Sequence, residues 1–324
     1  MKKLALILLS ALSIVFFVSC SSNNIEVMTD DDFPVLEDSR ENEEKMNTIT
    51  TLNGDDVTYN MNTRKIVCIF GSQDVVGFGI KLLAYEGTTD ITGYEKFYEG
   101  SQALNDISPF SVEEVMSYNP ELILVNQKMS SDNIKSLKTI APVIPLYTES
   151  NDFSIRLNYI GKIFGLEESA KKLVDYASNL RARMLNSINS LGLSDKTITI
   201  YTYMGNVTIV PERGWFMNVI IYDYLGMKRK DNVILFMQDE SSIAYQPISS
   251  EKIKDYEGDL VIFAGFGETS ISTYVSENVG WKRLKAVIED RVGVIDITPY
   301  AQKGVILLYN QYSQILNALT KAKG

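Results

Sequence analysis

Short runs of consecutive apolar residues alternate with stretches of helical periodicity along most of the chain. The apolar runs cover 65–70, 122–125 and 143–147 in the first half, and 197–203, 207–210, 260–263 and 292–297 in the second half. Runs of this length, separated by helical stretches, are typical of buried parallel strands joined by crossover helices. The pattern therefore predicts an α/β fold with two α/β lobes.

Helix start and stop signals support this interpretation. Ser111 stands directly before Val112-Glu113-Glu114 in a capping-box arrangement, and Pro120 closes the segment. Ser131 begins another helical stretch that ends before Pro142. Further helices are expected near 152–164, 215–226, 249–256 and 301–322.

A long helical stripe lies between the two halves. Its apolar positions recur at Ala170, Leu173, Val174, Ala177, Leu180, Met184, Ile188 and Leu191. A helix of about 25 residues spans roughly 37 Å, which is comparable to a whole domain. It is either a long surface helix or a rigid strut that joins the two lobes.

The first twenty residues have the pattern of an export signal. Met1-Lys2-Lys3 precedes a mostly apolar run from Leu4 to Val18, which is too short to span a bilayer comfortably. Ser19-Cys20 then resembles the lipobox of bacterial lipoproteins, in which the cysteine is lipidated and becomes the mature N-terminus. An ordinary signal peptide with an incidental cysteine is the alternative.

An acidic segment follows the signal. Nine acidic and two basic residues lie between Glu26 and Lys45, a composition with too little apolar surface to fold. We therefore expect a flexible tether. The remaining cysteine, Cys68, lies inside the apolar run of a predicted strand, where we expect a buried and unreactive thiol.

Composition excludes several classes of protein. The chain of 324 residues has a net charge of −10, which argues against nucleic acid as a partner. It contains no histidine, so Ser-His-Asp and Cys-His catalysis and His-ligated zinc or haem are excluded.

Four motifs in register resemble the substrate-binding proteins of iron-complex ABC importers, which bind ferric siderophores, haem or cobalamin. The helix from Ser111 runs into Pro120-Glu121-Leu122-Ile123, and Ile140-Ala141-Pro142-Val143 follows. Ser249-Ser250-Glu251 before Asp259-Leu260-Val261-Ile262 repeats the first motif in the second half. The last motif is Trp281-Lys282-Arg283-Leu284-Lys285-Ala286-Val287 with Arg291-Val292.

The resemblance implies the class III binding-protein fold, with a ligand cleft between two lobes joined by a single helix. The expected organisation is a signal peptide (1–19), an acidic tether (20–45), an N-terminal lobe (46–165), the connecting helix (166–192) and a C-terminal lobe (193–324). In this family an acid at the positions of Glu113 and Glu251 docks onto the permease. The general alternative is that each acid only complements a helix dipole.

Loops beyond the carboxyl ends of the strands supply the candidate ligand contacts. Candidates from these loops are Gln73, Lys128, Tyr203 and Phe266. Arg213 and Trp215 lead into the 215–226 helix, and the resemblance adds Phe110 and Tyr245. Tyr245 matches a family position for an aromatic residue, whereas Ile107 departs from an arginine of some siderophore binders, so Phe110 is the replacement contact. Each aromatic residue could equally belong to a core.

The implied ligand is a ferric siderophore, which aromatic faces and one or two cations suit. The protein itself needs no cofactor and no metal ligand, because the chelator holds the iron. Cobalamin is the alternative ligand, and haem would require Tyr or Met ligation. We expect a monomeric, lipid-anchored protein outside the cytoplasm that delivers its ligand to a permease and its ATPase.

Two other classes of protein compete with a binding protein. A surface glycosidase would need paired carboxylates, but acids such as Asp239-Glu240 carry no motif. A structural or adhesive lipoprotein is the other alternative. We therefore expect a protein that is not an enzyme.

Overall fold

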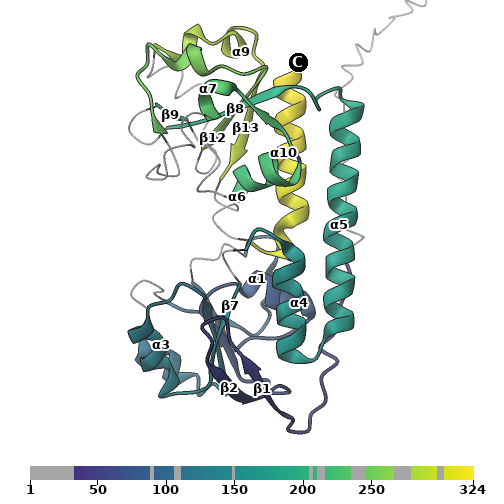
Figure 1. The fold of residues 1–324 in the computed structure, drawn as a ribbon, viewed down its shortest axis with the longest axis vertical. Coiled ribbons are helices and arrows are strands. Elements are labelled where there is room, and N and C mark those ends of the chain that lie inside the picture. Colours follow the sequence, from purple (N-terminus) through teal and green to yellow (C-terminus); the bar gives the residue numbers. More distant parts are fainter. Residues whose placement is uncertain are drawn as a thin grey trace, which may run out of the picture.

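The computed structural model describes residues 33–87, 91–105, 111–147, 150–203, 207–209, 216–234, 246–265, 279–297 and 303–324. Within these ranges the chain forms two α/β lobes that lie one above the other beside a long helix (Figure 1). The predicted α/β fold class is confirmed.

A parallel sheet forms the centre of the N-terminal lobe. Its strand order is β5 (Gln102–Ala103), β4 (Ala84–Tyr85), β3 (Ile66–Cys68), β6 (Leu122–Asn126) and β7 (Val143–Leu146). β3, β4 and β7 consist of buried residues, as do the first four residues of β6, and the continuous apolar runs of β3, β6 and β7 predict this. The sequence pattern did not reveal β4 and β5, which are two residues each.

Helices connect these strands. They are α1 (Ser72–Val75), η1 (Val76–Phe78), η2 (Glu95–Phe97), α2 (Val112–Ser117), α3 (Ser131–Lys138) and α4 (Phe153–Phe164). The predicted cap of α2 is present, because the Ser111 side chain accepts a hydrogen bond from the Glu114 N–H at 3.1 Å. A hairpin of β1 (Met46–Thr50) and β2 (Asp56–Asn60) packs beside α4, where the Tyr59 hydroxyl donates to the Ile163 carbonyl at 2.8 Å.

The C-terminal lobe contains a mixed sheet. Its order is β11 (Gln246–Pro247), β9 (Val207–Ile209), β8 (Thr197–Tyr203), β12 (Leu260–Gly265) and β13 (Val292–Asp296), and β10 (Lys228–Arg229) also pairs with β8. β8, β12 and β13 are parallel, whereas β9 runs antiparallel to β8. The short helical elements α7 (Asp231–Ile234), η6 (Trp281–Arg283) and α9 (Lys285–Ile288) complete the described part of the lobe.

Two helices predicted for this lobe differ in the structure. The stretch 249–256 is a turn followed by the 3-10 helix η5 (Ile253–Tyr256), so the predicted α-helix is wrong. The described part of 215–226 forms α6 (Phe216–Asn218), which continues as the π-helix η3 (Val219–Tyr224). Four apolar side chains in a row, Val219 to Tyr222, are buried there, and the wider helical turn places all of them in the core.

Helix α5 (Glu167–Ser190) is the predicted strut. Its buried residues Ala170, Leu173, Ala177, Leu180, Met184 and Ile188 belong to the predicted stripe. They lie in one hydrophobic core cluster that contains residues of both lobes. Gly161 of α4 permits close packing, because a Cβ there would lie 2.7 Å from the Ala170 Cβ.

The C-terminal helix and the residues before it make a further contact between the two lobes. α10 (Leu308–Lys323) lies beside α5 in Figure 1 and packs against β12 and β13. It is preceded by η8 (Val305–Leu307), which is buried against α1 and η1 of the N-terminal lobe. We refer to 303–307 as the crossing segment. The single helix predicted over 301–322 is thus two elements with different partners.

The flexible tether does not extend as far as Lys45. Residues 33–45, here called the strap, lie against the N-terminal lobe, where Phe33 packs edge-on to Phe97 and Tyr176 with ring centroids 5.5 and 5.1 Å apart. Arg40 is 7% exposed and donates to the carbonyls of Met61 and Thr63. These contacts overcome the acidic composition because they bury the few apolar and cationic groups of the strap.

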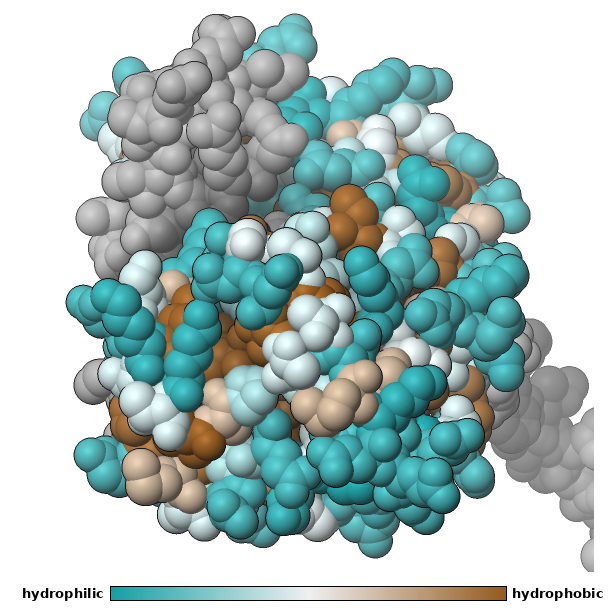
Figure 2. All heavy atoms as spheres, turned by 60° about the horizontal axis from the view of Figure 1, so that its bottom comes forward, coloured by the Kyte–Doolittle hydropathy of each residue, from teal (hydrophilic) through white to brown (hydrophobic). Residues whose placement is uncertain are grey.

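One face of the N-terminal lobe is largely hydrophilic. Figure 2 views the molecule with this lobe turned toward the reader and shows hydrophobic patches separated by charged and polar residues. Among the described residues, no helix combines the length and apolar character that crossing a membrane requires.

Candidate ligand-binding cleft

The strand order creates a topological switch point in each sheet. In the N-terminal lobe β3 pairs with β4 on one side and with β6 on the other. Later strands are added outward on both sides of β3, with β5 beyond β4 and β7 beyond β6. In the C-terminal lobe β8 and β12 are the corresponding parallel pair. Ligands of open α/β sheets bind beyond the carboxyl ends of the strands at such points.

The carboxyl ends of the two sheets face the same region between the lobes. α1 begins at Ser72, four residues beyond the end of β3, and so lies at the carboxyl edge of the N-terminal sheet. β13 ends at Asp296, and the crossing segment then places the Val305 N–H 2.8 Å from Asp74 Oδ1 of α1. The passage from β13 back to the N-terminal lobe therefore ends at the carboxyl edge of the N-terminal sheet.

Asp74 anchors this passage through a buried ion pair. Its Oδ2 accepts a hydrogen bond from Arg156 Nε of α4 at 2.7 Å, and the two side chains are 5% and 2% exposed. The Arg156 guanidinium lies 4.3 Å from the centre of the Phe153 ring, which in turn packs on Tyr224 of the π-helix with ring centroids 5.7 Å apart. Groups from both lobes thus meet around one carboxylate.

A second buried carboxylate lies at the carboxyl end of β4. Glu86 is 2% exposed, and its Oε1 accepts hydrogen bonds from the backbone N–H groups of Gly71 and Ser72 at 3.1 Å each. Burial raises the pKa of Glu86 to about 7, although these N–H groups act in the opposite direction. The Ser72 hydroxyl is also 2.9 Å from the Tyr98 hydroxyl.

Three of the predicted ligand contacts fall within the described residues. Gln73 is 1% exposed and packs beneath the crossing segment, because a Cβ on Gly304 would lie 2.1 Å from the Gln73 Cβ. Lys128 is exposed and follows β6, so it lies on the other side of the switch point. Tyr203 is the last residue of β8 and so lies at the carboxyl edge of the C-terminal sheet.

The other predicted contacts lie outside the described residues: Phe110, Arg213, Trp215, Tyr245 and Phe266. Cys20, the predicted lipidation site, also lies outside them. Their roles remain predictions.

The two glutamates predicted to dock on the permease occupy equivalent places in the two lobes. Glu113 is exposed in the first turn of α2, which precedes β6, and Glu251 is exposed in the turn that precedes η5 and β12. β6 and β12 are the central partners of β3 and β8. The repeated sequence motif therefore corresponds to a repeated structural position, although only Glu113 lies on an α-helix.

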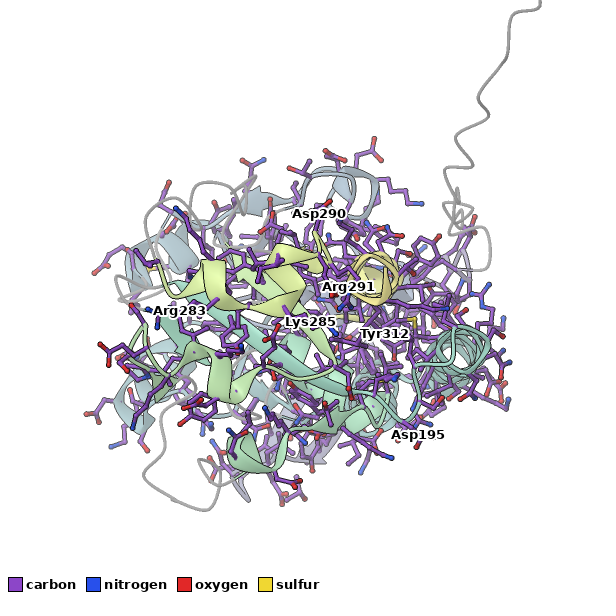
Figure 3. All side chains as sticks on the ribbon, turned by 90° about the horizontal axis from the view of Figure 1, so that it is seen from above. Asp195, Arg283, Lys285, Asp290, Arg291 and Tyr312 are labelled. Carbon is purple, nitrogen blue, oxygen red and sulfur yellow. The ribbon has the colours of Figure 1, made fainter. Side chains whose placement is uncertain are left out.

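The larger cavities bounded by described residues lie elsewhere. One, of about 970 Å³, lies between the strap and the N-terminal lobe. Another, of about 440 Å³, lies at the amino ends of β8 and β12 and is lined by Lys285 and Arg291. Figure 3 looks onto this end, where Arg291 lies beside α10. In the described part of the chain, no cluster of three or more acidic or cysteine side chains could hold a metal ion.

Sequence reasoning missed Asp74, Glu86 and Arg156. Glu86 directly follows the run Leu82-Leu83-Ala84-Tyr85, Asp74 directly precedes Val75-Val76, and Arg156 lies inside a helical stretch. For Glu86 and Asp74, a charged residue beside an apolar run was the available signal. Nothing in the sequence indicated which of them pair.

These features define a two-lobed binding protein of class III, in which one long helix supports both lobes. The sequence profile of the family described as "Periplasmic binding protein" matches residues 91–298. The chain belongs to this family, whose members are extracellular or periplasmic substrate-binding proteins rather than enzymes.

Relatives of known function support the assignment. The iron-uptake system-binding protein of Bacillus subtilis is 28% identical over 60% of this chain and 61% of its own length. The iron(3+)-hydroxamate-binding protein FhuD of Bacillus subtilis is 29% identical over 73% of this chain and 71% of its own. The chain thus spans about three-fifths of the first relative and somewhat more of the second.

A solved structure shows the same fold. A periplasmic binding protein of the FhuD fold family from Bacillus subtilis, a component of a Fep/Fec-like ferrichrome ABC transporter, superimposes with a TM-score of 0.69 at 25% identity. The match covers 84% of this chain and 99% of that protein. Two lobes joined by a long helix are therefore the shared architecture.

Proposed function

We propose that this protein is the substrate-binding lipoprotein of an ABC importer and captures a ferric siderophore between its lobes. The single observation that carries the proposal is family membership across 91–298 together with relatives that bind iron complexes. The two facing switch points supply a place for such a ligand. The protein binds without chemical turnover.

The chelator supplies the iron ligands, so the protein needs only to recognise the outside of the complex. Lys128 and the predicted contacts Arg213, Trp215 and Tyr245 offer cationic and aromatic groups for this purpose. A ferric hydroxamate is the favoured ligand class, because FhuD of Bacillus subtilis is described as a hydroxamate-binding protein.

Delivery requires a membrane partner. Glu113 and Glu251 are exposed at equivalent places in the two lobes, and we assign them to docking on the permease, which works with its ATPase. Lipidation of Cys20 holds the monomeric protein at the outer side of a membrane, with both lobes outside the cytoplasm.

Tryptophan fluorescence tests the binding function. The protein without residues 1–20 is titrated with a ferric trihydroxamate, a ferric catecholate, ferric citrate and cyanocobalamin, with correction for absorbance. We expect saturable quenching by the trihydroxamate that is lost in Trp215→Phe. Trp281→Phe is the matched control. Trp281 is 2% exposed in the core of the C-terminal lobe, so its fluorescence should not respond to the ligand and this variant should retain the quenching.

The outcomes separate the candidate ligands. Saturation by the catecholate alone would keep the importer function and change the siderophore class. Saturation by cyanocobalamin alone would replace iron by a corrinoid. No saturation by any of the four compounds would contradict the proposal.

A further inference from the structure

Glu86 is a buried carboxylate that forms no ion pair within the described part of the chain. Its Oε1 accepts the Gly71 and Ser72 N–H groups, whereas its Oε2 has no hydrogen-bond partner among the described residues. A buried carboxylate oxygen without a partner is costly when ionised. The raised pKa of this residue, about 7, is the expected consequence.

The neighbouring groups reinforce this situation. Three titratable side chains lie near Glu86: Cys68 on β3, Tyr85 on β4 and Tyr98 after η2. Burial and the Glu86 charge together raise the pKa of each of them. On α1, Asp74 adds a second negative charge near Cys68. None of these four groups is a cation. The backbone N–H groups of Glu86, Ser72 and Gly71 and the Ser72 side chain lower the pKa of Glu86, but burial outweighs them.

The element that Glu86 holds is unusually dependent on side-chain contacts. α1 has four residues, which is too short to be stable through its own helical hydrogen bonds. Glu86 binds its first N–H groups, and Asp74 connects it to Arg156 and to the crossing segment. Two buried carboxylates therefore fix both the start of α1 and its connection to the other lobe.

We propose that Glu86 is a positioning residue for the ligand site: its ionised carboxylate holds the backbone of Gly71 and Ser72 at the switch point, so that ligand affinity depends on the ionisation of this one group. The inference rests on the proposed function in that it places the ligand at this edge of the sheet. The link to α1 itself is independent of any ligand.

The direction of the effect follows from hydrogen-bond strength. An ionised carboxylate accepts charge-assisted bonds that are shorter and stronger than those to a neutral acid. Protonation of Glu86 therefore loosens Gly71 and Ser72, and with them α1. Affinity should fall as the pH decreases through about 7, which is the pKa of Glu86.

The experiment measures binding and local order in parallel between pH 5.5 and 8.5. The probe is a ferric trihydroxamate, which keeps its iron over this range. We expect affinity to fall about ten-fold from pH 8 to pH 6, since with a pKa of about 7 the ionised fraction of Glu86 falls from about nine-tenths to about one-tenth. Glu86→Gln should remove this dependence, and Glu99→Gln, an exposed acid in the same lobe, should retain it.

A measurement without ligand separates this inference from the proposed function. The protection factor of the Ser72 amide, corrected for intrinsic exchange, should decrease as the pH decreases in the natural protein and stay constant in Glu86→Gln. If no ligand binds but this pattern is present, the proposed function fails and the positioning role of Glu86 stands. If the protection factor is constant in the natural protein, the inference is overturned.

Carbon NMR of the natural protein provides a test that needs no variant. The Glu86 side-chain carboxyl should titrate near pH 7, well above the exposed glutamates. Titration near pH 4.5, or an equal pH dependence of affinity in Glu86→Gln, would overturn the inference.

Discussion

Asp74 and Arg156 are separated by 82 positions in sequence and form a buried ion pair with an Nε–Oδ2 distance of 2.7 Å. Asp74 also accepts the Val305 N–H, so the pair connects α1, α4 and the crossing segment. Removing one partner of a buried pair leaves an uncompensated charge, which is more costly than the pair is favourable. This relationship makes a specific prediction about stability.

Arg156→Ala should lower the free energy of unfolding by about 3–5 kcal/mol, because the Asp74 carboxylate would remain buried without its partner. Chemical denaturation measures the change. Lys171→Ala is the matched control, since the Lys171–Asp175 pair is exposed and its loss should not be detectable. An equally small effect of both substitutions would contradict the role assigned to the buried pair.

Gly79 is the position on which strap docking depends. It has a φ of +75°, and a Cβ there would lie 2.3 Å from the Leu36 carbonyl oxygen. Gly79→Ala should cost about 3 kcal/mol, of which 1–2 kcal/mol come from the left-handed backbone and the rest from displacement of the strap.

Gly54→Ala provides the control, because Gly54 has a φ of +84° but nothing lies within 4 Å of a Cβ. It should show only the backbone cost. Trypsin cleavage after Arg40 should accelerate in Gly79→Ala and not in Gly54→Ala. Equal cleavage rates in the two variants would show that Gly79 does not hold the strap.

The elements that sequence reasoning predicted correctly are those defined by local periodicity. Two kinds of pattern were clear: the apolar stripe of α5 from Ala170 to Ile188, and the apolar runs of β3, β6 and β12. Each pattern is longer than the error in the predicted ends of its element. The equivalent placement of Glu113 and Glu251 in the two lobes was also predictable, because both stand in a repeated motif, whereas their docking role stays a prediction.

The elements that were missed depend on contacts distant in sequence. The crossing segment has the same apolar pattern as α10, and only its three-dimensional contacts, such as the bond from the Val305 N–H to Asp74, show that it packs on the N-terminal lobe. The strap is acidic overall, so its docking through Phe33 and Arg40 could not be predicted from composition. β4 is too short for alternation to be visible.

Cys68 should be unreactive in the folded protein. It is fully buried on β3, and burial together with the nearby Glu86 carboxylate raises the pKa of its thiol well above the ordinary value. We expect no reaction with a disulfide reagent at pH 8 in native buffer and rapid, stoichiometric labelling in denaturant. Fast labelling of the native protein would show that β3 is accessible from solvent.

Charge reversal at the docking positions should separate delivery from binding. Glu113→Lys combined with Glu251→Lys should abolish uptake of the ferric ligand into cells while its affinity for the isolated protein stays unchanged. Both side chains are exposed, so the fold should not respond. Glu168→Lys, an exposed acid in the first turn of α5, is the control and should retain uptake. Loss of ligand affinity in the double variant would refute docking as the role of these residues.

The pH dependence of stability provides the last prediction. The folded-state pKa of Glu86 is about 7 and its ordinary value is 4.5, so between these values the folded protein binds a proton that the unfolded chain has released. The free energy of unfolding should therefore decrease as the pH rises from about 4.5 to about 7, by on the order of 3 kcal/mol.

Other shifted carboxyl groups act in a different pH range. The backbone N–H of Thr197 lowers the pKa of Asp259, so its contribution is complete above about pH 4 and constant in the Glu86 window. Denaturation in urea at half-unit steps between pH 4.5 and 8 measures the profile. Glu86→Gln should remove the decline, and Glu99→Gln should leave it, because Glu99 is exposed. A decline that persists in Glu86→Gln would mean that another group titrates in the core.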